Sequence, residues 1–182
     1  MKLIAIVGMT GSGKSESAKV FKEEGFPVIR FGDITDIIIK ERGMEFTEQN
    51  ERLIREQLRK ELGMAAYAIK NMPRIRESFE KSEIVVIDGL YSWDEYLYLR
   101  KEFGDDLVIL AIFASPRMRY ERLMKRPIRP FTIEQSISRD VAEIENIRKA
   151  GPIAMADYVI NNIGDLEDLK EDIVDFLNGF DY

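Results

Sequence analysis

The 182-residue chain contains no cysteine and no histidine. Without cysteine it can form neither a disulfide nor a thiolate metal site. Without histidine it can build neither a histidine-based catalytic triad nor a histidine metal site, because both need an imidazole ring. Any acid–base chemistry is therefore left to carboxylates, lysine or tyrosine.

The chain also lacks an apolar stretch long enough to span a bilayer, and its net charge is −6. A negative protein gives no reason to expect nucleic-acid binding unless it has a local basic patch. Residues 2–7 run directly into a glycine-rich segment, so we expect no secretory leader. We expect a cytoplasmic protein with no membrane or nucleic-acid partner, folded as one domain over residues 1–182.

The most informative segment is a complete match to G-x-x-x-x-G-K-[ST], the phosphate-binding P-loop motif. The motif consists of Gly8, Met9, Thr10, Gly11, Ser12, Gly13, Lys14 and Ser15. An apolar strand pattern precedes it and a helical pattern follows it, which is the context that such a motif requires. The alternative is a plain glycine-rich turn between a strand and a helix.

Each part of the motif has a chemical use. The glycines let several backbone N–H groups point at one place, and the following helix adds the positive end of its dipole. Lys14 can bind the β- and γ-phosphates, and the Ser15 hydroxyl can ligate Mg²⁺. We assign the motif, together with Ser17 on the same helix, to the binding of ATP with Mg²⁺.

Strand patterns alternate with helical patterns along the chain, which predicts a three-layer α/β/α fold with a five-stranded parallel sheet, as in P-loop NTPases. The strands are expected at residues 3–7, 27–31, 84–87, 107–113 and 158–161. The helices are expected at residues 14–24, 34–42, 48–61, 64–81, 93–103, 116–126, 133–149 and 166–178. The expected N-caps include Thr47, Ser92, Ser115, Thr132 and Asp165. Pro73 predicts a break or kink, and Gly151-Pro152 is expected to end a helix.

Two aspartates follow predicted strands, at the edge where ligands of open α/β sheets bind. Asp88 can hold Mg²⁺ or its waters beside Ser15, and with Gly89 it is a candidate acceptor contact. Asp33 can orient or deprotonate an acceptor. The alternatives are structural, with Asp88 starting a turn and Asp33 serving as the N-cap of the next helix.

Arginines gather around a basic, proline-flanked loop between two predicted helices, which predicts a hinged lid over residues 125–140. The arginines of this region are Arg119, Arg122, Arg126, Arg129 and Arg139. Because a guanidinium group matches phosphate oxygens and stays charged, we assign Arg122, Arg126 and Arg139 to catalysis with Lys14 and Asp33. The alternative is a solvated charged face, with acidic partners at Glu121, Glu134, Asp140 and Glu143.

The layout resembles that of the nucleoside monophosphate kinases, and within them the archaeal adenylate kinase-related proteins. The segments that carry the resemblance are Gly32-Asp33, residues 58–63, residues 86–89, Arg139-Asp140 and residues 156–162. Residues 121–126 and 156–161 also resemble dephospho-coenzyme A kinase. The resemblance implies an acceptor-binding helical insertion over residues 33–82, an acceptor contact at Arg59, and a loop at Asn161 that passes near the adenine.

Two positions depart from that pattern. Adenylate kinases carry an arginine three residues after Gly-Asp, where this chain has Asp36, and the archaeal relatives tend to carry one at the position of Tyr91. Both departures remove a cationic grip on an acceptor phosphate. Tyr91 could instead offer a flat face to a ring. Arginines of the acceptor-side helices could substitute for the lost ones: Arg42, Arg52, Arg55, Arg59, Arg74 and Arg76.

The sequence therefore predicts a Mg²⁺-dependent phosphotransferase that moves the γ-phosphoryl of ATP to a small phosphorylated acceptor, in the first place a nucleoside monophosphate. A dephospho-coenzyme A kinase-like activity and a regulatory ATPase without a small acceptor are the alternatives. The expected partners are a nucleotide and a small-molecule acceptor, and the protein is expected to be a monomer or a homodimer.

Overall fold

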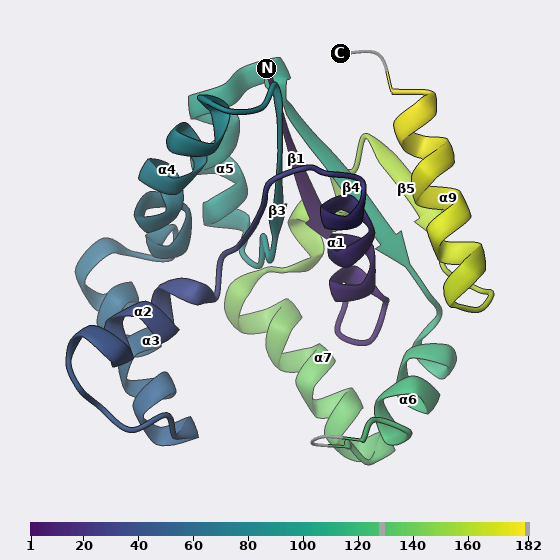
Figure 1. Cartoon of the computed structure of the whole chain (residues 1–182). Helices are drawn as coiled ribbons and strands as arrows, with labels where there is room; N and C mark the ends of the chain where they lie inside the picture. The colour runs from purple at the N-terminus through teal and green to yellow at the C-terminus, as the bar shows by residue number, and fades with distance from the viewer. Residues whose placement is uncertain (128–129, 181–182) are drawn as a thin grey trace.

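The computed structural model describes residues 1–127 and 130–180 (Figure 1). Its centre is a sheet of five parallel strands in the order β2-β3-β1-β4-β5. The strands are β1 (Lys2–Val7), β2 (Val28–Arg30), β3 (Ile84–Asp88), β4 (Leu107–Phe113) and β5 (Tyr158–Asn161). The predicted parallel sheet is confirmed.

Helices cover both faces of this sheet, so the layers are α/β/α as predicted (Figure 1). The helices are α1 (Lys14–Glu23), α2 (Asp33–Glu41), α3 (Glu48–Leu62), α4 (Ala66–Phe79), α5 (Trp93–Phe103), α6 (Pro116–Met124), α7 (Ile133–Ile147), α8 (Ala150–Ala154) and α9 (Leu166–Asn178). A short 3₁₀ turn, η1 (Gly104–Asp106), links α5 to β4. All five expected N-cap side chains are confirmed, because each accepts a backbone hydrogen bond from the first turn of its helix.

Successive side chains of the central strand β1 point to opposite faces of the sheet and pack into two separate hydrophobic cores. Leu3 and Ala5 pack with side chains of α4 and α5, whereas Ile4 and Ile6 pack with side chains of α1 and α9. A parallel strand covered on both faces reads as an unbroken apolar run, which is why the sequence pattern of β1 is continuous rather than alternating.

Two predictions about helix boundaries were wrong, a break at Pro73 and a helix that ends at Gly151-Pro152. Helix α4 runs through Pro73 without a break, and buried Met72 and Ile75 beside the proline pack into the core. Gly151 and Pro152 lie inside the short helix α8 rather than ending a longer one. The chain breaks earlier, at Arg148, whose backbone adopts a left-handed conformation with φ 52°. Pro152 is tolerated because it lies in the first turn of α8, where its missing N–H costs no helical hydrogen bond.

Asp33 is not the N-cap of α2. The helix begins at Asp33 itself, the cap residue is Gly32, and no side-chain hydrogen bond caps this end. The carboxylate of Asp33 instead pairs with Arg30 at 3.3 Å and with Arg74 at 3.0 Å.

The carboxyl ends of the strands face the space between two groups of helices, α2 and α3 on one side and α6 and α7 on the other (Figure 1). Arg129 of the predicted lid lies outside the described residues. Within residues 1–127 and 130–180, no helix combines the length and the apolar character that crossing a membrane requires.

Glu95 closes the N-terminal end of α5 from a fully buried position. Its carboxylate accepts backbone hydrogen bonds from Tyr91 at 2.8 Å and Ser92 at 3.1 Å. Burial raises the pKa of Glu95 from 4.5 to about 7, in spite of those two hydrogen bonds. Folded protein therefore holds a proton that the unfolded chain releases between these pH values.

The stabilisation that Glu95 contributes should be complete below pH 4.5 and lost as pH rises through about 7. We predict that Glu95→Gln gains stability relative to the wild type over this interval, by about 1 kcal/mol per pH unit. Urea unfolding from pH 5 to 8 measures the difference. Glu102→Gln on the same helix is the control, and equal slopes in all three proteins would contradict the assignment.

Candidate functional site

The P-loop follows β1 and leads into α1, as the motif predicts. Gly8 has φ 146°, and a side chain there would lie 2.5 Å from the carbonyl oxygen of Ile112. Gly13 has φ 108°, and a Cβ atom there would overlap the side-chain amide of Asn162. Both positions therefore need glycine for a backbone conformation and for space.

The tight packing at Gly13 gives a direct prediction. Gly13→Ala should destabilise the fold by about 2 kcal/mol or more, because the new methyl group meets Asn162 in addition to the unfavourable φ. Gly43→Ala is the matched control, since Gly43 also has a positive φ but a Cβ there meets nothing. Chemical denaturation of both variants measures the contrast, and equal losses would contradict the packing argument.

Lys14 is folded back onto the P-loop, where its ammonium donates a hydrogen bond to the Met9 carbonyl at 3.0 Å. Burial lowers the pKa of Lys14 to about 7, and the ammonium of Lys149 adds to this shift, whereas Glu143 and Asp88 oppose it. A buried ammonium that donates to a neutral carbonyl would gain from an anionic ligand beside it.

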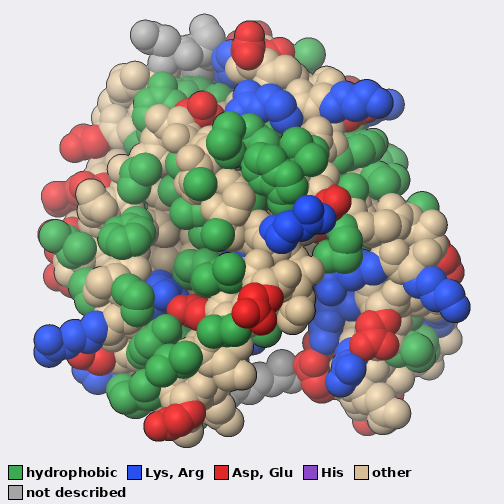
Figure 2. Space-filling view, turned by 180° about the vertical axis from the view of Figure 1, so that it is seen from behind, with side chains coloured by type: hydrophobic (Ala, Val, Ile, Leu, Met, Phe, Trp, Pro, Cys, Tyr) green, Lys and Arg blue, Asp and Glu red, His purple; other side chains and the backbone are tan. Residues whose placement is uncertain are grey.

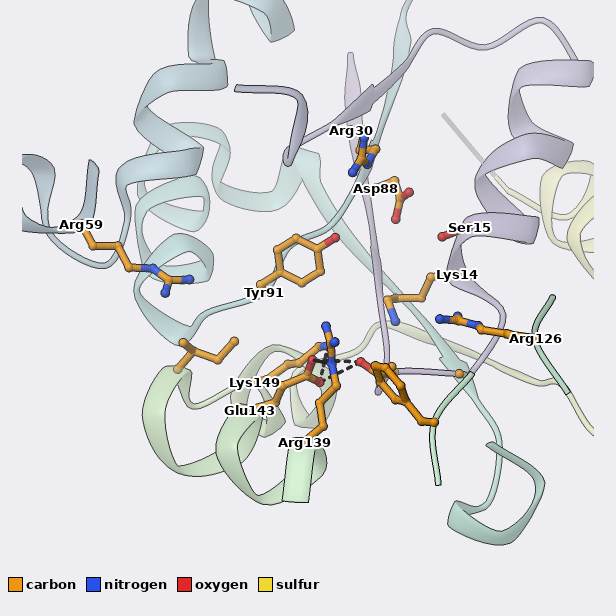
Figure 3. Close-up of a pocket in the computed structure, with 14 residues that line it drawn as sticks. Lys14, Ser15, Arg30, Arg59, Asp88, Tyr91, Arg126, Arg139, Glu143 and Lys149 are labelled. Atoms are coloured by element: carbon orange, nitrogen blue, oxygen red, sulfur yellow. Dashed lines mark hydrogen bonds and ion pairs between the residues drawn. The ribbon is translucent and has the colours of Figure 1, made fainter. Parts of the chain in front are cut away.

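Asp88 and Ser15 face the same space beside Lys14 (Figure 3). Asp88 is the last residue of β3 and 8% exposed, and burial raises its pKa against the attraction of Lys14 and Arg30. No cluster of three or more potential metal-ligating side chains is found among residues 1–127 and 130–180. A hydroxyl and a carboxylate nevertheless fit Mg²⁺, which prefers hard oxygen ligands and usually keeps several waters.

These side chains line a cavity of about 550 Å³ (Figure 3). From behind, the molecule is hollowed between its two groups of helices, and Lys and Arg side chains gather on a wall of the hollow (Figure 2). The cationic side chains of the lining are Lys14, Arg30, Arg59, Arg126, Arg139 and Lys149. The anionic ones are Asp88 and Glu143. This excess of positive charge in a protein of net charge −6 suits an anionic ligand.

Several residues assigned from the sequence meet at this cavity, and several do not. Those that line it are Thr10, Gly11, Lys14, Ser15, Arg59, Asp88, Tyr91, Arg126 and Arg139. Ser17 does not line it, because its hydroxyl is buried and donates to the Gly13 carbonyl. Asp33 does not line it either, and its ion pairs with Arg30 and Arg74 hold it beside the cavity wall.

Arg122 lies apart from the other predicted lid arginines. It donates to the carbonyl oxygens of Asn162 at 3.1 Å and Gly164 at 3.1 Å, and it lines a second cavity of about 280 Å³ with Gly13. Asn161 is exposed and lines a different groove, whereas Asn162 is buried and donates to the Ser12 carbonyl at 2.8 Å. The residue of this loop that contacts the P-loop is therefore Asn162, not Asn161.

Arg119 and Asp140 form an ion pair, but the pair is buried and not part of the solvated charged face that the structural alternative predicts. Their side chains are 5% and 12% exposed, and two hydrogen bonds of 3.0 and 2.6 Å join them. Arg119 also donates to the Thr10 carbonyl at 3.0 Å. The pair thus fixes α6 and α7 to each other and to the P-loop.

Glu143 and Lys149 were not assigned to the site from the sequence. Glu143 accepts hydrogen bonds from the P-loop hydroxyl of Thr10 at 2.9 Å, from Arg139 at 3.0 Å and from Lys149 at 2.7 Å. Burial acts to raise the pKa of Glu143, but Lys149 and the other donors outweigh it and hold the pKa below its usual value. The Arg139–Glu143 spacing of four residues signalled an ion pair on one helix face, but it did not reveal the partners from other elements.

Arg30 is a further charged lining residue that the sequence left unassigned. It ends β2, next to Asp88 in the parallel register of β2 with β3. Gly89, an expected acceptor contact, follows Asp88 with φ 111°, and a Cβ there would lie 2.7 Å from the ring of Tyr91. Gly89 therefore lets Tyr91 approach the carboxyl end of β3.

Comparison with known proteins identifies relatives over nearly the whole chain. Residues 4–147 match the family described as AAA domain. A UPF0200 protein of Thermococcus kodakarensis is 37% identical over 94% of this chain and 94% of its own length. A UPF0200/UPF0201 protein of Archaeoglobus fulgidus is 38% identical over 95% of this chain, which spans 54% of that relative.

Solved structures share the fold at low sequence identity. The structure of TT1252 from Thermus thermophilus superposes with a TM-score of 0.65 at 20% identity, covering 100% of this chain and 98% of the other. A shikimate kinase from Bacteroides thetaiotaomicron superposes with a TM-score of 0.60 at 16% identity, covering 97% of this chain and 98% of the other. A gluconokinase from Sinorhizobium meliloti superposes with a TM-score of 0.57 at 17% identity, covering 97% of this chain and 91% of the other. The architecture is thus that of P-loop kinases.

Proposed function

This chain belongs to the UPF0200 family, and its residues 4–147 match an AAA domain; on that premise we propose that it is a P-loop phosphotransferase that uses ATP and Mg²⁺. The observation that carries the proposal is the arrangement of Lys14, Ser15 and Asp88 at one end of a cationic cavity. Phosphoryl transfer needs positioning and charge stabilisation more than covalent chemistry from the protein, and this site offers both.

On this proposal the P-loop amides and Lys14 bind the triphosphate. Ser15 and Asp88 hold Mg²⁺, which offsets charge on the phosphates. Arg126, just beyond α6, and Arg139, within α7, line the cavity and stabilise charge on the transferred group. Arg122 and Asn162 line the second cavity together with Gly13 of the P-loop, and the base of the nucleotide would lie there.

The acceptor proposed is a small phosphorylated molecule, in the first place a nucleoside monophosphate bound by the insertion over residues 33–82. An oxygen of its phosphate forms a bond to the γ-phosphorus, the bond to the β–γ bridging oxygen breaks, and ADP leaves with that electron pair. A phosphate acceptor is already ionised and needs no general base. This agrees with an Asp33 that is paired with Arg30 and Arg74 rather than free to take a proton.

A transfer assay tests the function. Purified protein, MgATP and each of AMP, CMP, GMP, UMP and dephospho-coenzyme A are incubated separately, and the products are identified by mass. The expected result is ADP together with a nucleoside diphosphate. Phosphorylation of dephospho-coenzyme A instead would support the alternative kinase, and ATP hydrolysis that no acceptor stimulates would support a regulatory ATPase.

A further inference from the structure

Lys149 is a buried lysine in the wall of the cavity. Its side chain is 3% exposed, and its ammonium lies 5.3 Å from the centre of the Tyr91 ring. The left-handed backbone at Arg148 ends α7 and turns the chain into the short helix α8, which places Lys149 at this junction. The ammonium therefore reaches the cavity from a segment that lies after the predicted lid.

Tyr91 is held firmly under this ammonium. Its backbone N–H donates to Glu95 at 2.8 Å, and its ring packs against the backbone of Gly89. Burial raises the pKa of Tyr91, so its hydroxyl stays protonated at neutral pH and can donate a hydrogen bond. A fixed ring and a cation over its face form a rigid element rather than a mobile surface pair.

The anion that partners Lys149 is shared. Glu143 accepts hydrogen bonds from Lys149, Arg139 and Thr10 at the same time. Burial lowers the pKa of Lys149, although the attraction of Glu143 acts to raise it. The positive charge of Lys149 also helps burial to lower the pKa of Lys14. Two ammonium groups thus face one region, with fewer carboxylates than cations around them.

The donor nucleotide cannot account for all of this charge. Lys14, Arg126 and Ser15 lie at the P-loop end of the cavity, where a metal-bound triphosphate brings part of its own counter-charge. Arg59, Tyr91 and Lys149 lie toward the other side of the view (Figure 3). The cation of Lys149 lies over the Tyr91 ring, and its charge is felt by Lys14 of the first group.

We propose that Lys149, with Tyr91 beneath it, binds the phosphate of the acceptor and selects acceptors that carry a phosphomonoester. Arg59 supplies the second positive charge for this dianion, and the Tyr91 hydroxyl donates a hydrogen bond to it. This inference rests on the proposed function. The sequence lacks the phosphate-binding arginines of related proteins at positions 36 and 91. In this inference, a lysine at the junction of α7 and α8 takes their place.

Binding measurements test this separately from activity. Titration calorimetry with AMP, CMP, GMP, UMP and adenosine is carried out on the wild type, Lys149→Met and Lys149→Arg. Lys149→Met should weaken the best-bound monophosphate by about tenfold or more, because a charge-assisted contact is lost. Lys149→Arg should recover most of the affinity, and adenosine should show no such dependence. Binding of MgATP should change by less than about threefold in both variants.

Controls keep the outcome decisive. Lys101→Met on the exposed surface of α5 should leave all affinities unchanged. If Lys149→Met does not fold, Lys149→Gln keeps a hydrogen-bond donor for Glu143 without the charge. Unchanged monophosphate binding overturns the proposal, and so does an equal loss of monophosphate and MgATP, which would indicate a structural role. A wild type that binds MgATP but no monophosphate overturns this inference and the choice of a nucleoside monophosphate as acceptor, but not MgATP-dependent phosphotransfer, whereas failure to bind MgATP overturns the proposed function as a whole.

Discussion

Replacing Lys14 with alanine should reduce phosphoryl transfer by about 10³-fold or more while leaving the fold intact. The ammonium is the P-loop cation nearest the expected phosphates, and its hydrogen-bond acceptor is the neutral Met9 carbonyl at 3.0 Å. Burial lowers the pKa of Lys14, which means that the folded protein disfavours the charged ammonium. Removing this buried charge should therefore cost no stability. Transfer rates with MgATP and thermal unfolding measure the two effects.

The matched control is Lys22→Ala, an exposed lysine in the last turn of the same helix. It should retain activity within about twofold of the wild type. A Lys14→Ala protein that is folded and fully active would show that the P-loop lysine takes no part in the reaction.

The largest stability effect should follow from breaking the Arg119–Asp140 pair. Asp140→Asn leaves a guanidinium that is 5% exposed without its counter-charge, and this should cost about 3–5 kcal/mol of unfolding free energy. Because Arg119 also donates to the Thr10 carbonyl, the P-loop should loosen and MgATP affinity should fall as well. Urea unfolding and calorimetry on the same preparations measure both quantities.

Two further variants interpret that result. The combined replacement Arg119→Met with Asp140→Leu removes both charges and should recover much of the lost stability. Glu121→Gln breaks the exposed Arg117–Glu121 pair, where Arg117 is 90% exposed, and should change stability by less than about 1 kcal/mol. If Asp140→Asn cost no more than Glu121→Gln, the buried pair would not organise the site.

The features that the sequence predicted well are those set by neighbours along the chain. The P-loop follows from eight adjacent residues, and the capping boxes at Ser92 and Thr132 follow from residues three positions apart. The strands of the parallel sheet follow from short apolar runs such as that of β1. Each of these signals depends on the backbone preferences of residues close together in the chain, which can be inferred from the sequence alone.

The features that the sequence missed depend on contacts between distant elements. Glu143 was interpreted as a surface partner for arginines, because only its helix neighbour Arg139 was visible in the pattern, not Thr10 from the P-loop. Lys149 was predicted to lie at the end of a long helix. The left-handed backbone conformation at Arg148 ends that helix earlier, and because Arg148 is not a glycine, nothing in the sequence signalled it. Asp33 fitted an N-cap position, but the ion pairs with Arg30 and Arg74 determine where its side chain lies.

Titration calorimetry of the wild-type protein with ATP, with and without Mg²⁺, tests the central claim most directly. We expect uptake of one nucleoside triphosphate per chain that Mg²⁺ strengthens and that Lys14→Ala removes. The absence of any triphosphate binding by the folded wild-type protein in the presence of Mg²⁺ would contradict it.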